Sequence, residues 1–123
     1  MLDRVKYFDI FGIMETEAAL ASLAALAQPS RLAIFRLLVQ AGPDGLGVGD
    51  LRDQLDLPGA TLSAHLNVLR RAGLVQDRRD GRHICCFADF ARMNALIDYL
   101  TENCCAGAGC GLANPGAACG DKP

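Results

Sequence analysis

The chain has 123 residues, of which 51% are hydrophobic and 21% charged, with a formal net charge of −2. This fits one ordinary globular domain, and the overall charge gives no sign of a nucleic-acid partner. No stretch approaches the roughly 20 apolar residues of a membrane span, and residues 1–14 lack the apolar run and cleavage site of a secretory signal. We therefore expect a cytoplasmic protein whose six cysteines are reduced ligands or sensors rather than structural disulfides.

The first expected helix covers residues 17–27, which are rich in alanine and leucine. Leu20 and Leu23 recur there at helical spacing. Residues 1–16 have no clear hydrophobic period and are interpreted as an N-terminal arm. Met14 offers a second plausible start, so the residues before it can be an extension.

A second helix is expected over residues 31–40, because Pro29 disfavours helical geometry in the residue before it and ends the first helix. Ser30 is the expected N-cap. Residues 41–47 are a turn by composition. The apolar face of this second helix is expected to hold Leu32, Phe35, Leu38 and Val39.

The next segment has the pattern of a helix-turn-helix. Asp50 can cap a short helix over residues 51–56, residues 57–59 form a tight turn, and a second helix over residues 60–72 ends before Gly73, which suits the C′ position. The side chains of the second helix that are expected to face inward are Leu62, Leu66 and Leu69.

Small polar side chains cover the outer face of this second helix, namely Thr61, Ser63, His65 and Asn67. Such side chains can reach base edges in the major groove, while arginines at the helix end contact phosphates. A surface helix that simply faces solvent has the same pattern, so the spacing alone leaves both interpretations open.

A β-hairpin is expected after this helix, with strands over residues 74–78 and 82–87 on either side of an Asp80–Gly81 turn. This is the position of a wing. A local basic stripe on an acidic chain indicates a nucleic-acid face, although a solvated hairpin is the alternative. The stripe holds five arginines, Arg70, Arg71, Arg78, Arg79 and Arg82, against two aspartates, Asp77 and Asp80.

Asp89 is the expected N-cap of a last helix that ends near Asn103. Together with Leu20 and Leu23, its apolar stripe predicts a dimer interface between the first and last helices. The stripe consists of Phe90, Met93, Leu96, Ile97 and Leu100.

Two segments in combination resemble the ArsR/SmtB family of winged-helix metal-sensing repressors: "LAALAQPSRLAIFRLL" and "LSAHLNVLRRAGLVQDRRDGRHICCF". The resemblance covers residues 17–102. It implies a mainly helical, winged helix-turn-helix domain with a small β-hairpin, which both dimerises and binds palindromic operator DNA. It also implies that Thr61, Ser63, His65 and Asn67 lie in the groove, and that Arg70, Arg71, Arg78, Arg79 and Arg82 serve the phosphates or the minor groove.

The inducer sites usual for that family are missing. Many arsenic-responsive members carry Cys-x-Cys where this chain has Val48, Gly49 and Asp50. The paired Asp and His ligands of the zinc-type members are absent from the last helix, and the only histidines are His65 and His83. Both histidines are placed for DNA or the wing rather than for a metal.

The cysteines in the segment 103–123 are the remaining candidates. The sulfurs of Cys104, Cys105 and Cys110 can converge, because the five residues from Cys105 to Cys110 span at most about 17 Å and include two glycines. Trivalent arsenic or antimony takes three thiolates in a pyramid, and some ArsR members carry a similar C-terminal triplet. Cys85 and Cys86 point to opposite faces of a strand, so that at least one of them is expected to be a small buried hydrophobe.

Several alternatives for these thiols stay open. Zinc or cadmium would need a fourth ligand, for which Cys119 is the nearby cysteine. Thiol oxidation, a persulfide, an adventitious disulfide or an unconstrained tail would use the same residues. We expect a homodimeric transcriptional repressor that As(III) or Sb(III) releases from its operator, with no cofactor needed for folding. An enzyme is not expected, because the chain has no catalytic Cys–His–carboxylate grouping and no phosphate loop, and a metallochaperone would not explain the recognition helix and wing.

Overall fold

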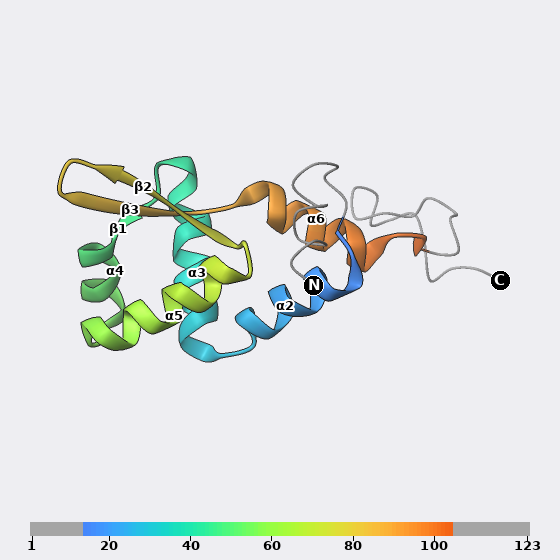
Figure 1. Ribbon diagram of the computed structural model, residues 1–123, viewed down its shortest axis with the longest axis horizontal. Coiled ribbons are helices and arrows are strands. Elements are labelled where there is room, and N and C mark those ends of the chain that lie inside the picture. The colour runs from blue at the N-terminus through green and yellow to red at the C-terminus, as the bar shows by residue number, and fades with distance from the viewer. Residues whose placement is uncertain (1–13, 105–123) are drawn as a thin grey trace.

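The computed structural model describes residues 14–104 and has a mainly helical, winged helix-turn-helix fold, as predicted (Figure 1). In Figure 1, α4 and the tip of the hairpin lie at the left, α5 and the hairpin extend across α3, and α2 and α6 lie at the right. The elements are α2 (Thr16–Leu26), α3 (Pro29–Ala41), the short 3₁₀ helix η1 (Gly42–Asp44), β1 (Leu46–Gly47), α4 (Val48–Leu55), α5 (Gly59–Arg71), β2 (Val75–Asp80), β3 (His83–Ala88) and α6 (Phe90–Thr101).

The main core lies between α3, α4, α5 and the base of the hairpin. The predicted inward leucines of α5 are confirmed, because each is at most 1% exposed. Burying a leucine completely contributes roughly 1.5–3 kcal/mol, so this face fixes α5 against α3. Leu32 was expected on the buried face of α3 but is 45% exposed. The largest fully buried apolar side chains are Ile34, Leu38, Leu51, Leu62, Leu66, Leu69, Leu74 and Cys86.

Two of the predicted helix caps are wrong. Gln28 is the N-cap of α3, and its side chain accepts a hydrogen bond from the Arg31 backbone N–H at 2.8 Å. Pro29 is the first helical residue, where its missing N–H costs nothing, so Ser30 already lies inside the helix. Asp50 lies in the first turn of α4 rather than at its cap.

The end of α5 is built as the sequence predicts. Gly73 has φ +82°, and its N–H donates to the Arg70 carbonyl at 2.9 Å, while the Leu74 N–H donates to Leu69 at 3.0 Å. This pair of hydrogen bonds is a Schellman motif. The guanidinium of Arg92, on α6, lies 2.7 Å from the position that a Cβ on Gly73 would occupy. The last helix therefore packs directly against the end of α5.

The hairpin is the larger part of a three-stranded antiparallel sheet with the order β1-β3-β2. Asp80 pairs with His83, so the turn residues are Gly81 and Arg82, one position later than expected. The strand β1 was not predicted, because its two residues carry no pattern of their own. It exists through its pairing with Cys85 and Cys86 of β3.

Gly45 leads into β1 with φ +72°, and a Cβ there would lie 2.2 Å from the carbonyl oxygen of Cys86. We expect Gly45→Ala to lower the free energy of unfolding by about 3 kcal/mol, because it combines backbone strain with a clash against β3. Gly42 is the matched control, since it has φ +79° with nothing within 4 Å. Gly42→Ala is expected to lose only about 1 kcal/mol, and equal losses in urea denaturation would contradict this account of Gly45.

The helices α2 and α6 pack against each other through a second, smaller core of Met14, Ala18, Ala19, Ala95 and Leu96. The predicted N-cap of α6 is confirmed: the Asp89 carboxylate accepts a hydrogen bond from the Arg92 N–H at 2.9 Å. Within residues 14–104, no single helix is long and apolar enough to cross a membrane, and α2 with Pro29–Asp44 reaches that length only across a 102° bend.

Candidate nucleic-acid interface and thiol site

The outer face of α5 borders an open hollow of about 790 Å³ between α4, α5 and the hairpin. Ser63, Asn67 and Arg70 follow one another at positions i, i+4 and i+7 and therefore lie on one stripe of the helix. The hollow is lined by Gly47, Val48, Gly49, Asp50, Ser63, Leu66, Asn67, Arg70, Arg82, His83 and Ile84.

Four of the nine predicted DNA-contacting residues meet in this hollow: Ser63, Asn67, Arg70 and Arg82. Thr61, which is exposed, and His65, which is half-buried, do not line it. Arg71 lines a different, smaller hollow of about 280 Å³ against α2 and α3. The predicted DNA-contacting residues of α5 therefore divide between two sides of the helix, and only one of these sides faces the hairpin.

The arginines of the hairpin also differ from one another. Because side chains alternate along a strand, Arg78 and Arg79 point to opposite faces of β2. Arg78 donates to the Asp44 carbonyl at 3.3 Å and lies 5.6 Å from the centre of the Phe87 ring, so it is held against the body of the protein. Arg79 and Arg82 are exposed, and the side chain of neither makes a hydrogen bond or ion pair with residues 14–104.

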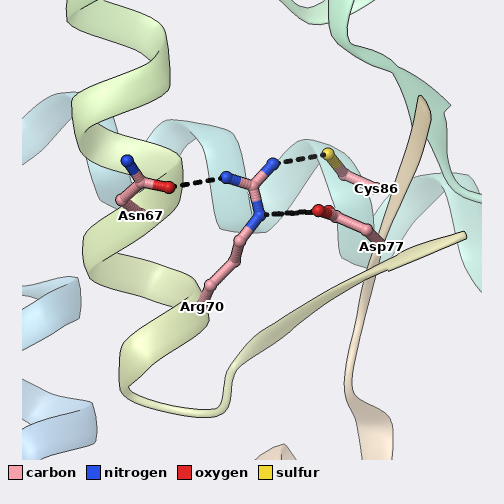
Figure 2. Close-up of polar contacts among 4 residues, drawn as sticks. All are labelled: Asn67, Arg70, Asp77 and Cys86. Atoms are coloured by element: carbon pink, nitrogen blue, oxygen red, sulfur yellow. Dashed lines mark hydrogen bonds and ion pairs between the residues drawn. The ribbon is translucent and has the colours of Figure 1, made fainter. Parts of the chain in front are cut away.

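Figure 2 shows that the guanidinium of Arg70 lies between α5 and both strands of the hairpin. Its Nε lies 2.9 Å from one carboxylate oxygen of Asp77 and 3.1 Å from the other. One terminal nitrogen donates to Asn67 Oδ1 at 2.8 Å, and the other lies 3.8 Å from Cys86 Sγ. All three nitrogens of this side chain are therefore engaged within the protomer.

Cys86 is completely buried, which confirms that at least one of the two hairpin cysteines serves as a small core residue. Burial raises the pKa of the Cys86 thiol to about 11, and the charge of Asp77 and its hydrogen bond act in the same direction. Arg70 opposes this shift in part. The thiol is therefore neutral at neutral pH and is a poor nucleophile.

We expect the raised pKa of Cys86 to make folding stability fall between about pH 9 and pH 11. The unfolded thiol releases its proton near pH 9, while the folded thiol holds its proton to about pH 11, so rising pH favours the unfolded chain. By pH ~10.5 the loss is about 2 kcal/mol. Urea denaturation of the wild type and Cys86→Ala at pH ~8 and ~10.5 measures it, and a difference between the two proteins that does not change with pH would refute it.

The predicted thiol triplet begins at the end of the described residues. Asn103 has φ +57°, a left-handed conformation that turns the chain after α6, and Cys104 follows it half-buried. Cys105, Cys110 and Cys119 lie outside the described residues. Within residues 14–104, no cluster of three or more His, Cys, Asp or Glu side chains is placed to hold a metal ion.

The residues predicted for the dimer interface fall into two groups. Leu96 is only 6% exposed, in the small core with α2, and Phe90 and Met93 pack partly against the main core. The other four, on α2 and α6, remain outside these cores, with exposures of 59% at Leu20, 39% at Leu23, 37% at Ile97 and 57% at Leu100.

The hollow also contains Gly47 to Asp50, which were not predicted to take part, and His83, which was assigned to DNA or the wing. The segment Gly47 to Asp50 is the N-terminal turn of α4, where backbone N–H groups lack partners within the helix and can meet an anion. The side chains of this segment do not indicate an anion site, because the hydrogen-bond donors are backbone N–H groups.

Comparison with known proteins agrees with this geometry. A helix-turn-helix domain family matches residues 26–78. The chain is 38% identical over 86 residues to MJ1325, an HTH-type transcriptional regulator of Methanocaldococcus jannaschii, which covers 70% of this chain and 94% of that protein. It is 42% identical over 91 residues to the biofilm growth-associated repressor of Agrobacterium fabrum, which covers 74% of each chain.

Solved structures give the same fold. An ArsR-like transcriptional regulator from Rhodococcus sp. RHA1 has a TM-score of 0.61 and 27% identity, covering 68% of this chain and 76% of that one. The homodimeric winged helix-turn-helix domain of Mb0332 from Mycobacterium bovis, described as possibly of the ArsR family, has a TM-score of 0.56 and 29% identity, covering 71% and 81%. A possible transcriptional regulator for arsenical resistance has a TM-score of 0.54 and 31% identity, covering 65% and 83%.

These relatives are transcriptional regulators, so the prediction that the chain is not an enzyme is confirmed. The recognition helix, the hairpin and the relatives lead to one conclusion: the chain belongs to the HTH-type transcriptional regulators, and its winged helix-turn-helix fold is that of ArsR-like regulators.

Proposed function

We propose that the protein is a cytoplasmic, homodimeric repressor that binds operator DNA and is released when trivalent arsenic or antimony binds Cys104, Cys105 and Cys110. The observation that carries the DNA-binding part is the hollow in which Ser63 and Asn67 of α5 meet Arg82 of the wing. Polar side chains that can read base edges thereby lie beside a cation that can contact phosphate.

The geometry also favours one way of reading a base. Arg70 occupies the carbonyl oxygen of Asn67, which leaves the amide N–H groups of Asn67 as outward donors. Ser63, one turn earlier on the same stripe, can donate or accept. We infer that α5 enters the major groove with this stripe facing the bases, while Arg79 and Arg82 approach the phosphates.

The exposed leucine and isoleucine side chains of α2 and α6 support the dimer. Leu20 and Leu23 lie on α2, and Ile97 and Leu100 lie on α6, and these two helices lie on the side of the molecule away from the tip of the hairpin (Figure 1). A second protomer packed there would bury them and place the two recognition helices about one DNA turn, about 34 Å, apart. The homodimeric Mb0332 domain supports the dimer itself by similarity.

The inducer part depends on where Cys104 lies. It lies three residues after the last residue of α6, and the residue just before it, Asn103, is left-handed, so an ion bound by Cys104, Cys105 and Cys110 would sit near the end of a helix of the proposed interface. Soft thiolates favour soft ions, and three of them satisfy the pyramid of trivalent arsenic. Zinc or cadmium with Cys119 as a fourth ligand, and oxidation or persulfide formation at the same thiols, are the alternatives.

The test is fluorescence anisotropy with DNA from upstream of the protein's own gene, with arsenite titrated into the complex. We expect arsenite to weaken binding by about 5- to 150-fold, with the loss of three reactive thiols per protomer. Parallel titrations use zinc, cadmium, peroxide and polysulfide. Release by one of these instead of arsenite would identify the alternative, and an absence of DNA binding would refute the proposal as a whole.

A further inference from the structure

We propose that Arg70 is a positioning residue: through Asp77 it fixes the wing to the recognition helix, and it does not serve as a phosphate contact. This inference rests on the proposed DNA-binding function and assigns a separate role within it. It also divides the five arginines of the basic stripe into those that shape the surface and those that meet DNA.

The first argument is the direction of the contacts. Arg70 belongs to the last turn of α5, and Asp77 lies on β2, directly opposite Cys86 of β3. The guanidinium therefore touches its own helix at Asn67 and both wing strands at once (Figure 2). A planar side chain with donors in several fixed directions can hold three elements in one arrangement, whereas a lysine ammonium on its flexible stem cannot.

The second argument is charge. DNA binding gains free energy when a cation neutralises a phosphate and releases a counterion. The charge of Arg70 is already neutralised by Asp77 at 2.9 Å, so that a phosphate would have to displace an existing partner. The side chains of Arg79 and Arg82 have no such partner among residues 14–104, so a phosphate can approach them without displacing another group.

The third argument concerns Asp77 itself. A carboxylate on the α5-facing side of the wing would repel DNA if it stood alone. Paired with Arg70, it adds no net charge to the surface. The side chains of the pair are 29% and 35% exposed, so its Coulomb energy is partly screened by water, and its main effect is on geometry rather than on stability.

A double-mutant cycle on operator binding tests the proposal. Arg70→Gln, Asp77→Asn and the double variant are each titrated with the operator at several salt concentrations. If the pair positions the wing, each single variant weakens binding by about 5- to 10-fold, the double variant is no weaker than either single variant, and the salt slope stays at the wild-type value. Arg70→Lys also binds the operator more weakly than the wild type does, because lysine cannot keep all three contacts.

A phosphate contact would give the opposite results. Arg70→Gln would then lower the salt slope by about 0.9 per protomer, Asp77→Asn would strengthen binding, and Arg70→Lys would retain most of the affinity. Any of these three results would overturn the proposal. Arg79→Gln is the matched control, for which we expect the lower slope in both the wild-type and the Asp77→Asn backgrounds. Failure of the proposed function would be seen separately, as wild-type protein that binds no operator.

Discussion

Replacing Arg79 and Arg82 together with glutamine is expected to weaken operator binding by about 10²- to 10³-fold near physiological salt. Both side chains are exposed and make no ion pair with residues 14–104, so that they keep their full charge for phosphates. In a dimer the change removes four cations, and the slope of log K against log salt should become shallower by about 3.6. Anisotropy titrations across a salt series measure both quantities.

Arg36 provides the control for this prediction. It lies on α3 beside a small hollow against α4, away from the hollow that Arg82 lines, and Arg36→Gln removes the same charge. We expect its salt slope to stay close to that of the wild type. If the Arg79 and Arg82 double variant also kept the wild-type slope, the wing would not be the part of the protein that meets phosphates.

Serine at any one of Cys104, Cys105 or Cys110 is expected to abolish release by arsenite while leaving operator affinity unchanged. Two thiolates cannot complete the three-thiolate pyramid, so the affinity for arsenite should fall steeply, and the 5- to 150-fold release expected of the wild type should shrink to about 2-fold or less. Operator affinity should remain, because Cys104 lies after α6, outside the hollow formed by α4, α5 and the wing. Anisotropy with arsenite titration measures both effects.

Cys119→Ser is the matched control for the triplet. We expect it to respond to arsenite as the wild type does, and to lose affinity only if zinc or cadmium with four thiolates is the natural inducer. Cys85→Ser is a second control on the wing. A normal arsenite response in all three triplet variants would place the inducer site elsewhere, and a loss confined to Cys85→Ser would place it on the wing.

The spacing of apolar residues predicted the parts of this fold that depend on local pattern. Leu62, Leu66 and Leu69 face the core, Asp89 caps α6, and Gly73 ends α5, because each needs only a helical period or a cap to be recognised. The caps at Ser30 and Asp50 were wrong for a related reason. More than one residue near a helix start can cap it, and tertiary packing decides which one does.

Other features could not be predicted, because they depend on contacts between distant residues. The strand β1 has two residues and exists only through β3, which lies almost 40 positions later in the chain. The engagement of Arg70 likewise depends on where the hairpin places Asp77, which composition cannot show. In the sequence all five arginines of the stripe look alike. In the structure Arg70 and Arg78 hold the protein together, while Arg79 and Arg82 are available to a partner.

The junction between β3 and α6 is a single residue, Asp89. Its N–H donates to the Leu74 carbonyl at 2.8 Å, and its carboxylate receives hydrogen bonds from both Gln76 and the Arg92 N–H. A linker this short and this fully bonded has no slack. If the C-terminal end of α6 is displaced, the helix would therefore tilt as a rigid body about Asp89. The displacement would then move the strands of the wing, because no flexible loop lies between α6 and β3 to absorb it.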